Sequence, residues 1–144
     1  MAEGKGSRMS GGTSPGALQL GLRHGMVVQE LGWDSDVDEE FRTDVMELID
    51  ADLVEEASDA VDAVLLWWRA DDGDVVDGLF DALRDLSSGG VVWLLTPKVG
   101  RPGHIPQADL AEGSLTAGLT LTSTARVSKQ WAANKIVRPK AGRR

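Results

Sequence analysis

Two apolar runs in the middle of the chain, with a helical pattern between them, give the clearest structural prediction. Val61 to Trp68 and Val91 to Leu95 are apolar almost without alternation, which is typical of strands buried on both faces of a parallel sheet. Between them, apolar residues recur at helical spacing from Val75 to Leu86, and the Ser-Ser-Gly-Gly sequence that follows indicates the end of a helix. The chain from Asp62 to Pro97 is therefore predicted to form a parallel strand–helix–strand unit, with a right-handed crossover.

The part of the chain before this unit predicts one strand and one helix. Met26 to Leu31 has the partial alternation of a strand. Apolar residues at helical spacing then predict an amphipathic helix over Asp36 to Ile49, which Ser35 or Asp36 can cap. The acidic segment Asp50 to Asp59 is ambiguous, and one or two further helical turns are one interpretation of it.

The last third of the chain predicts a short helix and two strands. The helix begins near Pro106, a residue favoured in the first turn, and runs to about Gly113. Leu119 to Arg126 alternates Leu with Thr, and Ala133 to Val137 is a short apolar run. These two segments are predicted to be antiparallel strands joined by a loop around Trp131.

Length and composition favour one small domain. The chain has 144 residues, which is typical of a single domain. Residues 1–16, rich in Gly, Ser, Lys and Glu, are predicted to be a disordered tail, residues 17–139 a single α/β domain, and residues 140–144 a basic tail. The sequence has no apolar run long enough to span a membrane, no signal-peptide pattern and no cysteine. We therefore expect a cytoplasmic protein without membrane contact.

Charge is distributed unevenly along the chain. Glu30 to Asp85 contains 20 acidic and 3 basic residues, a net charge of −17, whereas Lys98 to Arg144 has 9 basic and 2 acidic residues, a net charge of +7. Such a separation favours a basic partner on the acidic side or head-to-tail self-association; solvated acidic helix faces are the alternative interpretation. The overall acidity disfavours nucleic-acid binding, for which Lys135 to Arg144 is the remaining candidate segment.

The loops after the three predicted parallel strands carry the candidate site. Because the carboxyl ends of parallel strands meet at one edge of a sheet, these loops are expected to lie together. They would hold an anion on Lys98 and Arg101, with a ring stacked on Trp33 or Trp68. The alternative is that the ions pair locally and the Trp rings pack. The candidate ligand-binding residues are Trp33, Asp34, Trp68, Arg69, Lys98 and Arg101.

Neither a metal site nor a catalytic residue is predicted. The acidic run from Asp34 to Asp38 resembles the start of an EF-hand loop, but Glu39 replaces the required glycine and Val45 the bidentate glutamate. Capping of a helix explains these acids better. His24 and His104 lie beside glycines, without a nearby Ser or Cys nucleophile or the spacing of a metal pair.

Several short motifs together resemble a known family. They are Leu20-Gly-Leu, Val27-Val-Gln-Glu-Leu-Gly-Trp-Asp34, Asp62-Ala-Val-Leu-Leu-Trp-Trp68, Trp93-Leu-Leu-Thr-Pro-Lys98 and Val137-Arg-Pro-Lys-Ala-Gly142. Over residues 18 to 142 the chain resembles the small bacterial proteins of domain of unknown function 3052, a family common in actinobacteria. This resemblance supplies no activity.

At fold level, Asp62 to Pro97 resembles the middle of class I methyltransferases that use S-adenosylmethionine. The resemblance implies a sheet of about five strands in the order 1-2-3-5-4, with an antiparallel last strand and helices on both faces. Glu30-Leu-Gly-Trp-Asp34 stands where those enzymes have a G-x-G-x-x-G loop, and Asp50 to Ala60 is too short to contain two further strands. The resemblance therefore implies a truncated Rossmann-like sheet with its first strand at the edge, without a topological switch point and without a cofactor.

Two functional hypotheses follow. The first is a non-catalytic binding or regulatory domain that acts through protein–protein contact, with a partner or a second copy pairing with the edge strand Met26–Leu31. The alternative is a divergent methyltransferase-like enzyme, or a binder of small anionic ligands, that uses the loops at the carboxyl edge of the sheet.

Overall fold

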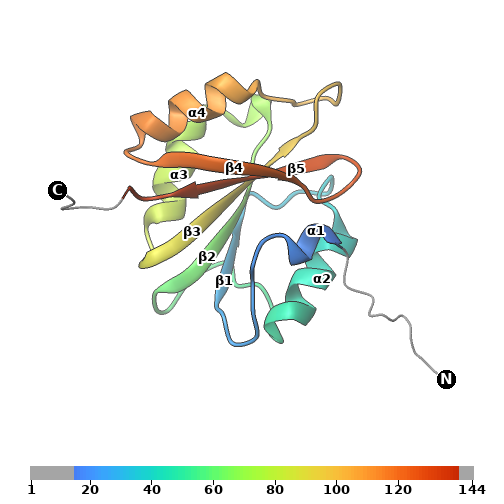
Figure 1. Cartoon of the computed structure of the whole chain (residues 1–144), viewed down its shortest axis with the longest axis vertical. Helices are drawn as coiled ribbons and strands as arrows, with labels where there is room; N and C mark the ends of the chain where they lie inside the picture. The colour runs from blue at the N-terminus through green and yellow to red at the C-terminus, as the bar shows by residue number, and fades with distance from the viewer. Residues whose placement is uncertain (1–14, 140–144) are drawn as a thin grey trace.

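The computed structural model describes residues 15–139 and contains one five-stranded sheet (Figure 1). The strand order is β1-β2-β3-β5-β4, with parallel pairing among the first three strands and antiparallel pairing of β5 with both β3 and β4. The predicted order and the antiparallel last strand are confirmed. The strands are β1 Val28–Leu31, β2 Val61–Trp67, β3 Leu86–Pro97, β4 Thr120–Arg126 and β5 Trp131–Val137.

Helices cover both faces of this sheet, as predicted. Helices α1 and α2 lie on one face, and α3 and α4 lie on the other (Figure 1). None of the helices within residues 15–139 is long and apolar enough to cross a membrane. The helices are α1 Pro15–Leu18, α2 Glu39–Ile49, α3 Val75–Leu83 and α4 Gln107–Thr116, with a 3₁₀ turn η1 at Ala70–Asp72.

Strand β2 is buried on both faces, which explains its unbroken apolar run. Ala63, Leu65 and Trp67 pack with α2, whereas Val64 and Leu66 pack with α3 and α4. Successive side chains of a strand point to opposite faces, so both sets must be apolar when helices cover both sides. The sheet therefore has two cores, and β2 belongs to both.

The glycines after α3 do not end a helix. Helix α3 ends at Leu83, and β3 already begins at Leu86, so Gly89 and Gly90 lie inside the strand. The register between β2 and β3 shifts there, because Val61 pairs with Leu86 while Ala63 pairs with Val91. A glycine pair inside a strand is typical of such an irregularity, and a side chain at Gly90 would meet Leu86.

Helix α2 begins three residues later than the sequence pattern predicts. Asp38 caps it by accepting a hydrogen bond from the backbone N–H of Phe41, at 2.9 Å. The predicted caps Ser35 and Asp36 are wrong, because Asp36 is held by Arg69 instead. The prediction of a loop around Trp131 is also wrong, since this residue starts β5 and pairs with Pro97 of β3.

The segment after α2 forms no helix and pairs with the outer edge of β1. Val54 accepts a hydrogen bond from the Glu30 N–H at 2.8 Å and donates its own N–H to the Val28 carbonyl at 3.0 Å. The predicted edge position of β1 is confirmed, but the expectation that its backbone is unpaired is wrong at Val28 and Glu30. The reason is that the chain itself passes outside β1 on its way from α2 to β2. Residues 1–14 of the predicted N-terminal tail, and the predicted tail 140–144, lie outside the described residues.

Helices α2 and α3 follow successive parallel strands but lie on opposite faces of the sheet. Two right-handed crossovers that step in the same direction would place both helices on one face, so these two connections differ in hand. Consequently the chain runs from β1 toward a helix on one face and from β2 toward a helix on the other. The strand order shows no reversal, as expected, and Arg69 occupies the crevice between these two loops.

Candidate functional site

Arg69 fills the crevice between the loops after β1 and β2. Its guanidinium makes a bidentate ion pair with Asp36 and donates to the Gly32 carbonyl at 2.8 Å and to Asp72 at 3.2 Å. Asp72 also accepts the backbone N–H of Arg69, at 2.9 Å. The prediction that these loops lie together is correct for the first two strands. The Arg69 side chain is only 12% exposed, so its charge serves to join the loops.

The titration behaviour of this pair follows from its geometry. Burial of the Arg69 guanidinium disfavours its charge, but hydrogen bonds to Asp36 and Asp72 outweigh this, and the pKa of Arg69 is raised. The hydrogen bonds from Arg69 lower the pKa of the Asp36 carboxyl against a smaller opposing effect of its own burial. Both groups are therefore charged throughout the neutral pH range.

An aromatic cluster lies beneath Arg69. The guanidinium carbon is 5.3 Å from the centre of the Trp131 ring, within the range of a cation–π contact. Trp67 packs edge-on against Trp131, with ring centres 4.8 Å apart, and against Phe41, with ring centres 6.1 Å apart. The Trp131 indole donates to the backbone carbonyl of Asp36 at 3.2 Å. The carboxyl ends of β1 and β2 are thus filled with packed rings.

Glu30 of β1 is a buried carboxylate beside this cluster. Arg42 of α2 donates to both of its oxygens, each at 2.7 Å, and the Trp67 indole donates to one of them at 2.9 Å. The hydrogen bonds from Arg42 to Glu30, and to a lesser extent its bond to Glu39 at 2.6 Å, raise the pKa of Arg42 despite its partial burial. A carboxylate with three charge-assisted donors is fully partnered, so Glu30 is a structural residue on this face of β1.

Gly32 allows the loop after β1 to lie against β2. Its φ of +77° is in the left-handed region, and a Cβ there would lie 2.2 Å from the carbonyl oxygen of Trp67. Only glycine fits this approach. In the same position a dinucleotide-binding loop would present further glycines, which the sequence lacks.

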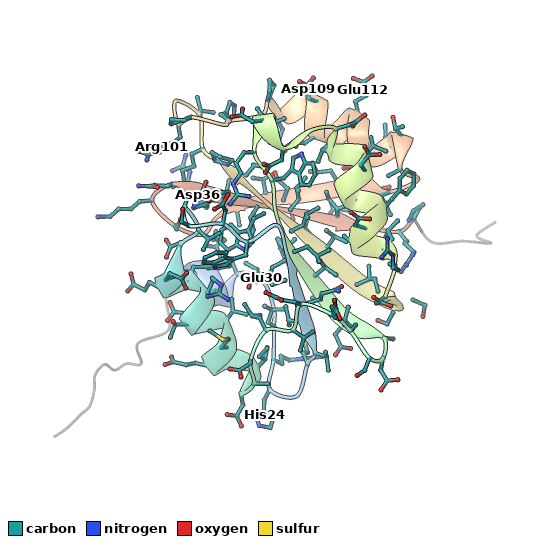
Figure 2. All side chains as sticks on the ribbon, turned by 180° about the vertical axis from the view of Figure 1, so that it is seen from behind. His24, Glu30, Asp36, Arg101, Asp109 and Glu112 are labelled. Atoms are coloured by element: carbon teal, nitrogen blue, oxygen red, sulfur yellow. The ribbon has the colours of Figure 1, made fainter. Side chains whose placement is uncertain are left out.

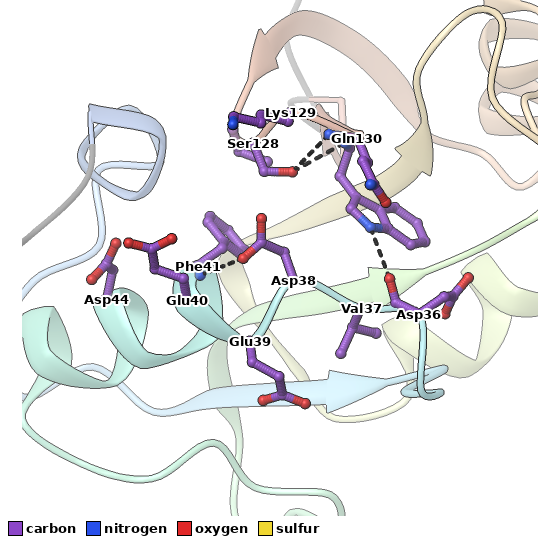
Figure 3. Close-up of a pocket in the computed structure, with 12 residues that line it drawn as sticks. Asp36, Val37, Asp38, Glu39, Glu40, Phe41, Asp44, Ser128, Lys129 and Gln130 are labelled. Atoms are coloured by element: carbon purple, nitrogen blue, oxygen red, sulfur yellow. Dashed lines mark hydrogen bonds between the residues drawn. The ribbon is translucent and has the colours of Figure 1, made fainter.

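A hollow of about 630 Å³ lies next to the cluster, between the start of α2 and the loop that joins β4 to β5 (Figure 3). We call it the rim hollow. Acidic side chains line the α2 side, and Lys129 is the only base that residues 15–139 contribute to the lining. Its lining residues are Asp36, Val37, Asp38, Glu39, Glu40, Phe41, Asp44, Val127, Ser128, Lys129, Gln130 and Trp131.

The two predicted Trp residues each have a hydrogen-bond partner of their own. Trp33 is half-exposed and donates its indole N–H to Glu39 at 3.3 Å. Trp68 packs toward α3, on the face opposite Trp67 and Trp131, and donates to the Gly73 carbonyl at 3.3 Å. Trp68 therefore packs on the face opposite Trp131, with which Arg101 lines a hollow.

Lys98 and Arg101 follow β3, as predicted, and neither forms an ion pair with another residue of the range 15–139. Arg101 lines a hollow of about 150 Å³ together with Asp36 and Trp131. Figure 2 shows Asp36 and Arg101 at the same end of the molecule, with His24 at the opposite end. Asp34 is exposed and accepts the backbone N–H of Ser35 at 2.7 Å.

Sequence reasoning missed Glu30, Arg42 and Trp131. Glu30 is an acid inside a largely apolar strand, and Arg42 is the one base of an acidic helix. The sequence could therefore have predicted that these two residues pair. Trp131 had no such signal, because its place beside Asp36 depends on how β5 inserts next to β3.

Residues 17–140 match a family described as "Protein of unknown function (DUF3052)". The chain belongs to this family. Its relatives include the uncharacterized proteins Rv2239c of Mycobacterium tuberculosis and Mb2263c of Mycobacterium bovis. Each is 45% identical over 131 residues, which cover 89% of this chain and 82% of the relative. The predicted family resemblance is confirmed.

Solved structures similar to this DUF3052 protein are methyltransferases. One is the O-methyltransferase NcsB1 from neocarzinostatin biosynthesis, with a TM-score of 0.59 and 15% identity over 80% of this chain and 49% of that chain. The DUF3052 chain thus spans about half the length of NcsB1. Another is a SAM-dependent methyltransferase from Aquifex aeolicus, with a TM-score of 0.56 and 14% identity over 87% of this chain and 94% of that chain. Likeness at this level of identity establishes the fold.

The residues at the carboxyl edge of the DUF3052 sheet do not fit S-adenosylmethionine. Such folds bind nucleotides in the crevice outside the carboxyl ends of their strands. Here Arg69 spans that crevice with four hydrogen bonds, and Trp67, fully buried, occupies the space beneath it. We therefore derive no methyl transfer for this chain.

Proposed function

We propose that this DUF3052 protein is a non-catalytic, cytoplasmic binding domain that acts through protein–protein contact, with a basic partner on its acidic side. The observation that carries the proposal is the filled crevice, in which Arg69 takes the place available to a ligand in related folds. A domain that keeps the sheet and closes the ligand crevice is expected to work through its surface.

The charges of the surface support a basic partner. The rim hollow has acids along α2 and a single base, Lys129. Complementary potentials speed association and exclude like-charged proteins, so this surface favours a positively charged contact. Strand addition at β1 is a weaker route, because Val54 already uses two backbone groups of that edge.

Titration calorimetry tests the non-catalytic part of the proposal. S-adenosylmethionine and S-adenosylhomocysteine, each added to the full chain, are expected to produce no heat of binding. Enzymes bind their substrates with constants between about 1 µM and 1 mM. Binding of either compound in that range would overturn the proposal.

Affinity capture of the full chain at native abundance tests the protein–protein part. A basic protein retained in stoichiometric amounts and released by high salt is the expected result, since exposed charge pairs are screened by salt. A strictly monomeric chain that retains no protein would contradict the proposal.

A second candidate function is the binding of a small oxyanion by Lys98 and Arg101. The specific observation in its favour is that neither side chain has an ion-pair partner within residues 15–139, although Arg101 lines a hollow. Its volume of about 150 Å³ is smaller than that of a typical ligand pocket, so it suits a phosphate better than a nucleotide. Phosphate-induced NMR shifts at Lys98 and Arg101, abolished by Arg101→Met, are expected for this candidate, and unshifted signals would remove it.

A further inference from the structure

A groove runs along the face of β1 that is opposite α2. It encloses about 610 Å³, within the range of ligand sites. Gln29 and Leu31 of β1 and Leu66 of β2 form its floor, residues 55–57 form one wall, and α3 with the residues after it forms the other. We call it the β1 groove.

The groove exists because no helix within residues 15–139 covers β1 on this face. Helix α3 packs on β2 and β3, where Leu79 and Ala82 join the core. The connection after α2 passes outside β1 at Val54 and supplies only an irregular segment on this side. The sheet face beside α3 is therefore left hollow along β1.

Gln29 is the unusual residue of the floor. It is 5% exposed, and its amide nitrogen donates to the Glu55 carbonyl at 3.0 Å. Its amide oxygen accepts no hydrogen bond from any residue in the range 15–139. A buried acceptor without a donor costs desolvation free energy, and such groups are rare in native structures. The floor of the groove thus lacks one hydrogen-bond donor.

The walls of the β1 groove are acidic on both sides. Glu55 and Glu56 stand on one wall, and Asp81 and Asp85 stand on the other. Among the lining residues that the structure describes, Arg84 is the only base, and it pairs with Asp81 at 3.2 Å on the surface. The missing donor and the unbalanced carboxylates both point to a cationic group.

Trp68 forms an apolar end of the groove. Its ring lies against Gly78 of α3, where an added Cβ would be 2.8 Å from a ring carbon. This close approach holds the ring in place, and Leu31 and Leu66 extend the apolar surface along the floor. An alkyl or aliphatic portion of a ligand can pack there while its charged end meets the carboxylates.

We propose that the β1 groove binds an extended basic segment of a partner protein. An arginine or lysine of that segment donates to the amide oxygen of Gln29 while its stem packs on Leu31 and Trp68. Because this oxygen is covered in the free protein, the Gln29 amide rotates, or its neighbours shift, when the segment enters. The inference rests on the proposed binding function, places the contact in the β1 groove rather than at the rim hollow, and names the chemistry of the partner.

Fluorescence anisotropy with two labelled peptides tests the proposal. The probe is an acetylated and amidated octapeptide with three arginines and three leucines, and its counterpart has glutamate at the arginine positions. The arginine peptide is expected to bind the full chain at least about tenfold more tightly, and to weaken as salt is raised. Equal affinity for both peptides would overturn the proposal.

Substitutions in the groove distinguish a specific site from general acidity. Asp85→Asn and Glu56→Gln are each expected to weaken the arginine peptide severalfold. Glu47→Gln, which removes an exposed acid of α2 on the other face, should leave its affinity unchanged. If Glu47→Gln weakens binding as much as the groove variants, the groove is not the site.

Gln29→Met tests the unpartnered oxygen itself. Methionine keeps the shape of the side chain and removes the acceptor. About tenfold weaker peptide binding is expected, because hydrogen bonds to charged groups are worth at least one decade in affinity. The melting temperature should fall little, since the substitution also removes a buried unpartnered oxygen. Unchanged peptide affinity with a large fall in melting temperature would assign Gln29 a purely structural role.

The two proposals fail in different ways. A chain that binds S-adenosylmethionine contradicts the non-catalytic function, whatever the peptides do. A chain that captures a basic partner but binds the arginine peptide equally well after Gln29→Met and Asp85→Asn contradicts the β1 groove alone.

Discussion

Two neighbouring polar residues on opposite faces of β1 differ in the hydrogen bonds that their side-chain oxygens receive. Glu30 and Gln29 are each 5% exposed, and they point to opposite sides of the strand. Glu30 receives three hydrogen bonds from Arg42 and Trp67, whereas the amide oxygen of Gln29 receives none from the described residues. Burial alone therefore does not tell a structural residue from a candidate binding residue; the number of satisfied hydrogen bonds does.

The difference arises from what covers each face. On the first face, α2 brings a base to the buried carboxylate and the aromatic cluster excludes water. On the second face, the irregular segment around Glu55 supplies a backbone carbonyl that accepts from the Gln29 amide nitrogen, but it supplies no donor for the Gln29 amide oxygen. The closed face stabilises the domain, and the open face carries the proposed contact.

The largest expected effect comes from breaking the ion pair on the closed face. Arg42→Met leaves the Glu30 carboxylate buried without its main partner, and such changes lower the free energy of unfolding by about 3–5 kcal/mol. Urea denaturation measures this loss. Arg84→Met is the matched control, because the Arg84–Asp81 pair is mostly exposed and is worth less than about 1 kcal/mol. Equal losses for the two variants would contradict a closed, buried pair.

Substitution of two consecutive tryptophans compares the stability contributions of the two faces directly. Trp67→Phe removes an indole donor from Glu30 and is expected to cost about 1.5–3 kcal/mol, the value of a hydrogen bond to a charged group, in addition to lost packing. Trp68→Phe removes a longer bond to a neutral carbonyl from a half-buried ring, for which about 1 kcal/mol is expected. Chemical denaturation of both variants gives the order, and a larger loss for Trp68→Phe would reverse our assignment of the two faces.

A smaller effect is expected at the cap of α2, the helix that closes the first face. Asp38→Ala removes the acceptor for the Phe41 N–H and should cost about 1 kcal/mol. Ser35→Ala is the control, since Ser35 is a cap by sequence pattern only, and it should cost almost nothing. Thermal unfolding of the two variants decides whether the helix starts at Glu39; a greater loss for Ser35→Ala would show an earlier start.

The smallest effect is a change in pH dependence at Arg69. The pKa of Asp36 is lowered in the folded chain, so its stabilising contribution is present above its unfolded pKa of about 3.9 and is lost as pH falls through the lowered value. The stability difference between wild type and Asp36→Asn should therefore shrink as the pH is lowered below about 4. Denaturation curves between neutral and acid pH measure it. A stability difference that grows in acid would contradict the Arg69–Asp36 pair. At neutral pH, 1 M salt should reduce the stability difference between wild type and Asp36→Asn.

The sequence predicted the fold best where a run of apolar residues had a single structural role. The apolar runs of β2 and β3 could be recognised because double burial demands them, and the strand order followed from the fold-level resemblance to class I methyltransferases. The prediction of an anion site at Lys98 and Arg101 stays a prediction. Of its two candidate stacking residues, Trp33 and Trp68, the second faces α3, because consecutive strand residues alternate and Trp67 takes the other side.

The rest of the site depends on contacts between distant parts of the chain. Asp36 has the pattern of a helix cap, and only the folded chain brings it to Arg69, 33 residues away. Val54 has no strand pattern around it, and its pairing with β1 follows from the path of the connection. Local patterns carry no information on such long-range partners.

The tryptophan indole signals of a ¹H–¹⁵N NMR spectrum provide the most direct test of the contrast between the two faces. Adding the arginine peptide should shift the Trp68 indole and leave those of Trp67 and Trp131 in place, and adding S-adenosylhomocysteine should shift none of the three. Shifts of Trp67 and Trp131 on addition of S-adenosylhomocysteine, with Trp68 unmoved by the peptide, would contradict a closed cofactor crevice and an open β1 groove.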